Sequence, residues 1–99
     1  MSYVIFNGEI VKRGQVKIDF EDRGYQFGDG IYEVIRIYNG KPFALKEHLD
    51  RLYASAEKIY MDIPYTKDEL EKMIYSGLDV EGVRQSNLYS QYSRGVAAR

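Results

Sequence analysis

Three glycines lie close together in residues 23–30, and this segment has the least ordinary composition in the chain. They are Gly24, Gly28 and Gly30, with the spacing G-x-x-x-G-x-G. This spacing is neither the G-x-G-x-x-G fingerprint of dinucleotide-binding proteins nor the Walker loop that surrounds nucleotide phosphates. Glycine permits left-handed backbone angles and lets other atoms come close to the backbone. On these grounds alone we expect a tight connection between strands rather than a ligand-binding loop.

A histidine and an arginine lie three residues apart, at His48 and Arg51. In a helix this spacing places both side chains on the same side. A guanidinium offers a planar set of donors that matches the oxygens of a phosphate or a carboxylate. Glu47 lies beside them, however, and a hydrated, charged helix face explains the same residues without a ligand. Spacing alone favours that second explanation.

The elements that position these residues begin with two predicted β-hairpins. Asn7-Gly8 separates two β-prone runs within residues 3–11. The same pair recurs at Asn39-Gly40, after the β-branched and aromatic residues 31–38 and before residues 41–44. Asn-Gly favours the two-residue type I′ turn, because both central positions need a positive φ. We therefore expect an antiparallel sheet.

Two helices and a last strand follow. Apolar residues at helical spacing predict an amphipathic helix over residues 46–60. Thr66 and Glu69 have the spacing of a capping box, so a second helix begins there and ends near Gly82. Residues 87–93 alternate between two faces and predict a strand. The predicted fold is α+β: an antiparallel sheet built from hairpins and packed against two helices in a two-layer sandwich.

Composition excludes several classes of function. Lys+Arg number 14 and Asp+Glu 15, which leaves a net charge of −1. This balance argues against nucleic acid or a membrane surface as a partner. The absence of cysteine excludes disulfides and cysteine-ligated metals. No apolar run approaches the roughly 20 residues that span a bilayer, and residues 1–6 are too short for a signal peptide, so we expect a cytoplasmic protein.

Three segments together carry a family resemblance. They are residues 22–34 (DRGYQFGDGIYEV), 47–52 (EHLDRL) and 93–95 (SRG). In order and spacing they resemble the fold-type IV pyridoxal-phosphate-dependent enzymes, which include D-amino-acid aminotransferases, branched-chain aminotransferases and aminodeoxychorismate lyases. Residues 50–59 and 63–67 are most similar to the bacterial D-amino-acid aminotransferases. The resemblance covers essentially the whole chain and identifies residues 1–99 as the N-terminal domain of such an enzyme.

The resemblance assigns roles to five residues. Arg51, together with His48, resembles the part of the family site that holds the phosphate of pyridoxal 5′-phosphate. Tyr32 and Arg99 resemble two members of the group that holds the substrate's carboxylate. Val34 shares a strand face with Tyr32 and could line the same pocket. Packing against a neighbouring strand is the alternative role for Tyr32.

The resemblance also implies that part of the enzyme is missing. Transamination needs a lysine that forms a Schiff base with the cofactor and moves a proton. In the family this lysine and the acidic partner of the pyridine nitrogen belong to the following domain. None of the seven lysines of the chain matches that position: Lys12, Lys17, Lys41, Lys46, Lys58, Lys67 and Lys72. We therefore expect a C-terminal domain of the same protein to complete the site, and the 99 residues alone to be inactive.

The activity implied by the resemblance is the transfer of an amino group between D-amino acids, of the D-alanine type, and 2-oxo acids by a homodimer. A branched-chain aminotransferase or an aminodeoxychorismate lyase of the same fold is the nearest alternative. A non-catalytic binding or assembly module is an alternative from another class, and the ten tyrosines of the chain suit such a surface. Visible absorption by lysine-bound pyridoxal phosphate separates the enzyme from the module.

Overall fold

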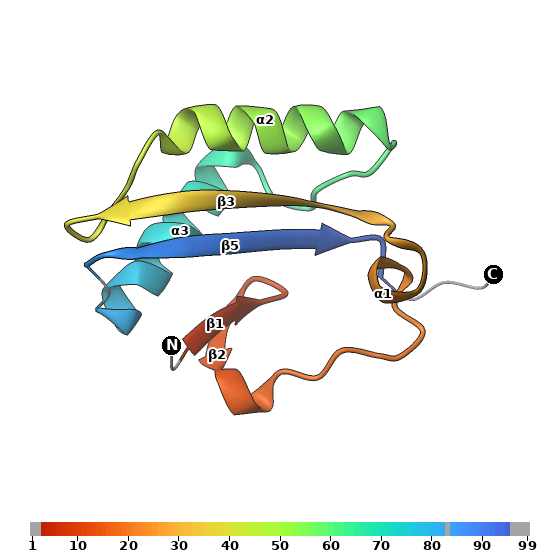
Figure 1. Cartoon of the computed structure of the whole chain (residues 1–99), viewed down its shortest axis with the longest axis horizontal. Coiled ribbons are helices and arrows are strands. Elements are labelled where there is room, and N and C mark those ends of the chain that lie inside the picture. Colours follow the sequence, from red (N-terminus) through yellow and green to blue (C-terminus); the bar gives the residue numbers. More distant parts are fainter. Residues whose placement is uncertain (1–2, 83, 96–99) are drawn as a thin grey trace.

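The computed structural model describes residues 3–82 and 84–95. These residues form an α+β fold, as predicted, with helices on one side of a sheet (Figure 1). In chain order the elements are β1 (Tyr3–Phe6), β2 (Glu9–Lys12), the short 3-10 turn η1 (Arg13–Gln15), α1 (Arg23–Phe27), β3 (Gly30–Tyr38), β4 (Lys41–Pro42), α2 (Leu45–Lys58), α3 (Lys67–Glu81) and β5 (Ser86–Ser93).

Both Asn-Gly turns are confirmed. Asn7 and Gly8 have φ angles of 51° and 83°, and Asn39 and Gly40 have φ angles of 50° and 76°. The hairpins lie in separate sheets: β1 pairs with β2 alone, whereas β3 lies between β4 and β5. A turn specifies only which strands are local partners, so the sequence pattern predicted the hairpins but not their division between two sheets.

β3 is the central strand of the larger sheet. β5 pairs with it along its whole length, from Gly30 opposite Ser93 to Ile37 opposite Ser86. β4 pairs only with Ile37 and Tyr38. The opposite edge of β3 therefore has no strand partner over most of its length within the described part of the chain.

The two predicted helices are confirmed. α2 begins one residue before the predicted start and ends at Lys58, two residues before the predicted end. At the start of α3, the Thr66 hydroxyl accepts from the Glu69 amide at 3.1 Å, and the Glu69 carboxylate accepts from the Thr66 amide at 2.9 Å. Gly82 ends α3 with a φ of 68°. The capping box and the glycine therefore determine both ends of this helix.

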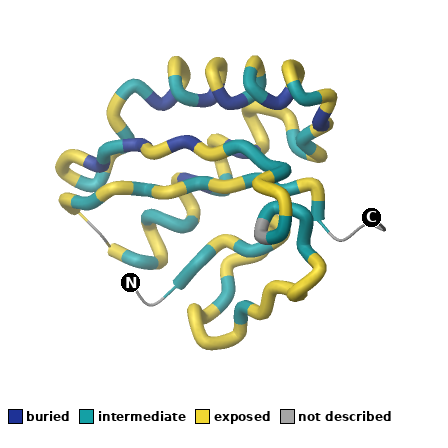
Figure 2. The backbone as a smooth tube through the Cα atoms, turned by 45° about the vertical axis from the view of Figure 1, so that its right-hand side comes forward, coloured by how far each residue is buried: buried dark blue, intermediate teal, exposed yellow. Residues whose placement is uncertain are grey.

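The core lies between β3 and the two long helices. α2 runs along β3 on the side away from β5 (Figure 1). Buried positions follow the inner side of α2 and alternate along β3 (Figure 2), as a strand with one covered face requires. Hairpin β1-β2 packs on α3, where Ile5 lies against Gly77. The central cluster consists of Ile35, Leu45, Leu49, Leu52, Leu70 and Ile74.

The glycine-rich segment is a tight connection, as its composition predicted, and it contains the short helix α1. A Cβ on Gly24 would lie 2.7 Å from the Cβ of Ser93, and a Cβ on Gly30 would lie 2.7 Å from the backbone oxygen of Tyr92. Gly28 ends α1 with a φ of 64°. Each glycine therefore has a structural reason: close contacts exclude a side chain at Gly24 and Gly30, and the left-handed backbone at Gly28 favours glycine.

Candidate functional site

Glu33 is a charged residue buried on the helix-facing side of β3. Its side chain is 5% exposed. It lies in the same row as Ile35 and Ile37, because alternate residues of a strand share a face. The strand therefore places a carboxylate beneath α2. The next two positions on the same face of β3 are apolar.

Two residues of α2 reach this carboxylate. His48 Nδ1 lies 2.6 Å from Glu33 Oε1. Arg51 Nε lies 3.1 Å from Oε1 and 3.2 Å from Oε2 of Glu33, and Arg51 Nη2 also donates to Oε1. The structure thus brings His48 and Arg51 together on one side of the helix, as their spacing predicted. It also adds Glu33, to which sequence reasoning gave no role.

The charges of this cluster are mutually compensated. The hydrogen bond from Arg51 holds the pKa of Glu33 below its ordinary value, against the opposing effect of burial, and the contact with His48 acts in the same direction. Glu33 in turn raises the pKa of Arg51. The carboxylate therefore stays ionised at neutral pH although it is buried.

The guanidinium of Arg51 also has an outer edge. The Arg51 side chain is 67% exposed. Its Nε and Nη2 contact Glu33, whereas its Nη1 makes no hydrogen bond within the described residues. Planar donors on an exposed edge suit a phosphate or carboxylate oxygen. The exposed edge of Arg51 could therefore bind a phosphate or a carboxylate.

Tyr32 and Val34 lie on the opposite face of β3. Tyr32 is 65% exposed and stacks on Tyr89 of β5, with 5.8 Å between ring centroids and 18° between planes. Val34 is exposed on the same face, opposite Tyr89 in the strand register. The shared face of Tyr32 and Val34 is confirmed, and cross-strand packing of Tyr32 is present too. Arg99 lies outside the described residues.

The sheet therefore divides the four described residues of the predicted site, together with Glu33, into two groups. Glu33, His48 and Arg51 lie on the face that the helices cover. Tyr32 and Val34 lie on the other face, which we call the open face. The open edge of β3 separates the two faces at this point, because β4 begins to pair only further along the strand. A ligand that lies across this edge could contact both groups.

A second charged cluster is structural. Asp29 Oδ2 accepts from Arg23 Nε and from Arg94 Nε, each at 2.8 Å. Arg94 also donates to the backbone oxygen of Ile59 at 2.7 Å. The hydrogen bonds from Arg23 and then Arg94 lower the pKa of Asp29. This cluster joins the segment after α1, the end of β5 and the end of α2, and so holds the start of β3 in place.

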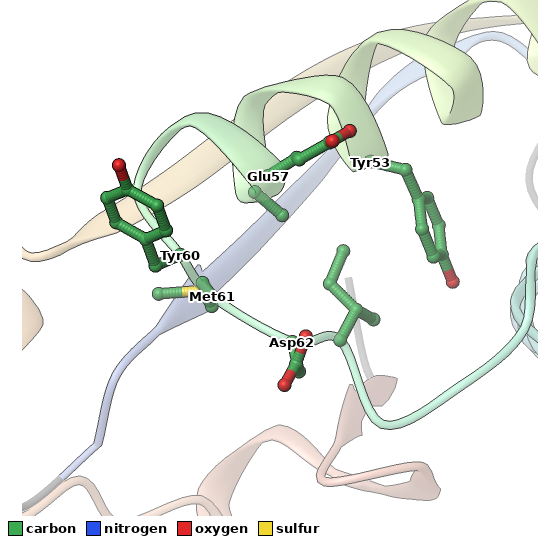
Figure 3. Close-up of a pocket in the computed structure, with 7 residues that line it drawn as sticks. Tyr53, Glu57, Tyr60, Met61 and Asp62 are labelled. Carbon is green, nitrogen blue, oxygen red and sulfur yellow. The ribbon is translucent and has the colours of Figure 1, made fainter.

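A shallow hollow lies at the end of α2 and contains none of the predicted site residues. Figure 3 shows Glu57 on the helix and Asp62 on the loop that follows. In the part of the chain that the structure describes, no group of three or more His, Asp or Glu side chains could hold a metal ion. No helix among the same residues is long and apolar enough to cross a membrane. The hollow is lined by Tyr53, Ala56, Glu57, Tyr60, Met61, Asp62 and Ile63.

The omission of Glu33 from the predicted site has a simple cause. Its position in β3 belongs to an otherwise apolar row that includes Ile31, Ile35 and Ile37. An acidic residue in such a row is a signal that sequence reasoning could have used, since a buried carboxylate needs a partner. The identity of the partner is not visible in the sequence, because it belongs to a helix that packs on the strand.

Comparison with known proteins identifies the family. The family model for amino-transferase class IV matches residues 30–99. The D-alanine aminotransferase of Listeria monocytogenes serotype 1/2a (strain 10403S) is 50% identical over 93 residues, which are 94% of this chain and 32% of that protein. The D-alanine aminotransferase of Bacillus licheniformis is 49% identical over 96 residues, which are 97% of this chain and 34% of that protein.

Solved structures agree with this result. The T.th. branched-chain amino acid aminotransferase with pyridoxamine 5′-phosphate is 30% identical, with a TM-score of 0.91 over 98% of this chain and 33% of that one. The putative 4-amino-4-deoxychorismate lyase from Legionella pneumophila shares the fold at a TM-score of 0.80 and 22% identity. The chain spans about a third of the length of the relatives it matches. It belongs to the class IV aminotransferase family, as its motifs predicted.

Proposed function

We propose that residues 1–99 are the N-terminal part of an aminotransferase that moves amino groups between D-amino acids and 2-oxo acids. One observation carries this proposal: two D-alanine aminotransferases are 50% and 49% identical to nearly the whole chain. The matched branched-chain aminotransferase is only 30% identical over a similar range. The identities therefore favour the D-amino-acid enzyme over the alternative with the same fold.

The family implies pyridoxal 5′-phosphate as the cofactor, and Arg51 fits its phosphate. The outer edge of the guanidinium is exposed, and its plane is held by Glu33. Arg51 would bind the phosphate through these remaining donors. When bound, the cofactor supplies the ring that withdraws electrons from the substrate's α-carbon. We propose that the lysine that would hold the cofactor covalently lies in a C-terminal domain of the same protein, so that the 99 residues alone would be inactive.

The role of His48 depends on its protonation. The Glu33 carboxylate only accepts hydrogen bonds, so Nδ1 of His48 carries the proton of the contact between them. In neutral His48 the other nitrogen, Nε2, is therefore an acceptor, and it donates to a phosphate only in the imidazolium form. We propose that His48 mainly orients Glu33 and assists phosphate binding when it is charged.

The substrate would bind on the other side of the β3 edge. Tyr32 and Val34 form part of an exposed face there, and Tyr32 carries a hydroxyl that can donate to a carboxylate. We propose that Tyr32 and Arg99 bind the substrate's carboxylate and that Val34 lines the same pocket. The cofactor's phosphate at Arg51 and the substrate at Tyr32 would then meet across the open edge. We also propose that the enzyme is a homodimer, as the family resemblance implies, and that it is cytoplasmic.

Activity of the full-length protein tests the proposal. We expect a visible absorption band from lysine-bound pyridoxal phosphate, and conversion of D-alanine and 2-oxoglutarate to pyruvate and glutamate. L-Valine and 4-amino-4-deoxychorismate are the comparison substrates, and we expect much slower turnover of both. Preference for L-valine would identify a branched-chain enzyme, and pyruvate release from 4-amino-4-deoxychorismate would identify a lyase. A protein that binds no pyridoxal phosphate would be a non-catalytic module.

A further inference from the structure

The stability of the fold does not explain why a charged residue, Glu33, occupies a buried position. An ionised carboxylate is much less stable in an apolar interior than in water. Partners can offset this cost, but well-packed apolar residues usually stabilise such a position at least as well as a buried ion pair does. Glu33 shares its row with Ile35 and Ile37, and its side chain is almost fully buried. The reason for a charge at this position therefore lies in the side chains that the carboxylate contacts.

Glu33 holds one edge of the Arg51 guanidinium. Nε contacts both carboxylate oxygens, at 3.1 and 3.2 Å, and Nη2 contacts Oε1. A guanidinium is planar and rigid, so fixing one edge also fixes the direction of the other. An exposed arginine without such a contact samples many rotamers and loses that freedom when it binds a ligand. The outer donors of Arg51 are thus oriented before any anion arrives.

His48 holds the same carboxylate from a second direction. Its Nδ1 lies 2.6 Å from Oε1 of Glu33, the oxygen that also accepts from Arg51. Because two side chains of one helix contact one carboxylate, Glu33 has little freedom to rotate. The carboxylate is therefore a fixed support for Arg51.

We propose that Glu33 is a positioning residue that orients Arg51 for binding the cofactor's phosphate. This inference rests on the proposed function, in which Arg51 is the phosphate ligand. Two other roles give different results when Glu33 is replaced. If Glu33 serves only packing, its loss changes stability and leaves cofactor affinity unchanged. If Glu33 acts only as a counter-ion that competes with the phosphate, its loss strengthens cofactor binding.

The test is a double-mutant cycle in the full-length protein, read out as the dissociation constant of pyridoxal phosphate from the apoenzyme. We expect Glu33→Leu to weaken binding by about threefold to tenfold, because Arg51 must then be ordered on binding. Glu33→Gln keeps an acceptor oxygen and should recover part of the loss. In an Arg51→Ala background, Glu33→Leu should cause no further loss, since its effect passes through Arg51.

Two measurements separate this inference from its alternatives. The melting temperature of the apoenzyme shows whether Glu33→Leu folds normally, and Glu33→Gln serves if the leucine variant does not fold. Glu57→Gln removes an equal charge from the end of α2, away from Arg51, and should leave affinity unchanged. The ³¹P chemical shift of the bound cofactor should move in both Glu33 variants and stay the same in Glu57→Gln.

The outcomes are distinct from failure of the proposed function. If the unmodified protein binds no pyridoxal phosphate, the proposed function is wrong. If the unmodified protein binds it and Arg51→Ala weakens binding, but both Glu33 variants bind as tightly as the parent or more tightly, only the positioning role is wrong. The positioning role is also wrong if the losses from Glu33→Leu and Arg51→Ala simply add.

Discussion

At the scale of single residues, the ion pair with Glu33 makes Arg51 more important for stability than an exposed arginine usually is. An arginine on a hydrated helix surface contributes little to stability, because water and salt screen its contacts. Arg51 is largely exposed, but its partner is buried. Removing the arginine leaves a buried carboxylate without its main donor, which is costly. Arg51 therefore matters for stability as well as for the proposed cofactor site.

Substitution of Arg51 separates these two effects. We expect Arg51→Ala to weaken pyridoxal phosphate binding by about tenfold to a hundredfold, since a charge-assisted contact to a dianion is lost. The apoprotein should also melt at a lower temperature, because Glu33 loses its partner. Arg51→Lys should recover only part of both losses, since an ammonium has no planar fork. Cofactor retention on dialysis and the melting temperature measure the two effects, and unchanged retention in Arg51→Ala would show that Arg51 is not the phosphate ligand.

The pH dependence of stability reports on Glu33. Its pKa in the folded protein is lowered from the ordinary value of 4.5 by Arg51, with a further contribution from His48. The ionised carboxylate therefore stabilises the folded state above pH 4.5, and this contribution is lost as the pH falls through the lower, folded pKa. We expect the free energy of unfolding to fall more steeply with acid in the unmodified protein than in Glu33→Gln. Denaturant titrations between pH 3 and pH 7 measure this difference, and parallel curves would contradict it.

At the scale of elements, the pairing of β3 with β5 depends on the absence of a side chain at Gly30. A Cβ at this position would lie 2.7 Å from the backbone oxygen of Tyr92. Backbone atoms of a paired strand cannot move aside as a flexible side chain can. The Asp29 cluster fixes the same end of the strand through Arg23 and Arg94. This end of β3 precedes Tyr32 and Glu33 directly, so its geometry sets the position of both groups of the candidate site.

Gly30→Ala tests this dependence. We expect it to lower the free energy of unfolding by about 1–3 kcal/mol, as overpacking of a close contact does. Gly14→Ala is the matched control, because a Cβ there meets nothing within 4 Å and its φ is not in the left-handed region. Thermal unfolding of both variants decides the matter. Equal melting temperatures for the two variants would show that β5 can shift at little cost.

At the scale of the whole molecule, the two faces of the larger sheet differ. The helices cover one face, whereas the other presents exposed aromatic and aliphatic side chains from both long strands. Tyr32 and Tyr89 stack there, beside Val34. Exposed apolar surface of this kind usually meets another surface in the functional protein. We therefore expect the open face to pack against another protein surface, such as the C-terminal domain or the second subunit proposed above.

The isolated 99-residue chain should reveal this surface by self-association. At micromolar concentration we expect it to sediment faster than a monomer, since no element among the described residues covers the open face. Tyr89→Ser removes an exposed ring from that face and should shift sedimentation towards the monomer. Tyr75→Ser, which removes an exposed ring from α3, should have no such effect. A chain that sediments as a compact monomer would contradict the expectation.

The local structure could be predicted well because its causes are local. The Asn-Gly pairs specify positive φ at both turns, and Thr66 and Glu69 satisfy backbone groups within one helical turn. The alternation of β5 and the spacing of α2 follow from the same short periods. The motifs around the glycine-rich segment also identified the family. None of these features needs knowledge of a distant residue.

Only the tertiary structure shows how these helices and strands pack against one another. Glu33 contacts residues 15 and 18 positions away on another element, and only the packing of α2 on β3 shows that they meet. The same packing places Arg51 and His48 on the opposite side of the sheet from Tyr32 and Val34. Which edge of β3 stays open likewise depends on where β4 ends and β5 pairs. The sequence by itself therefore determined the elements and the family, whereas the buried carboxylate and the two-sided site depend on contacts that form only when the elements pack.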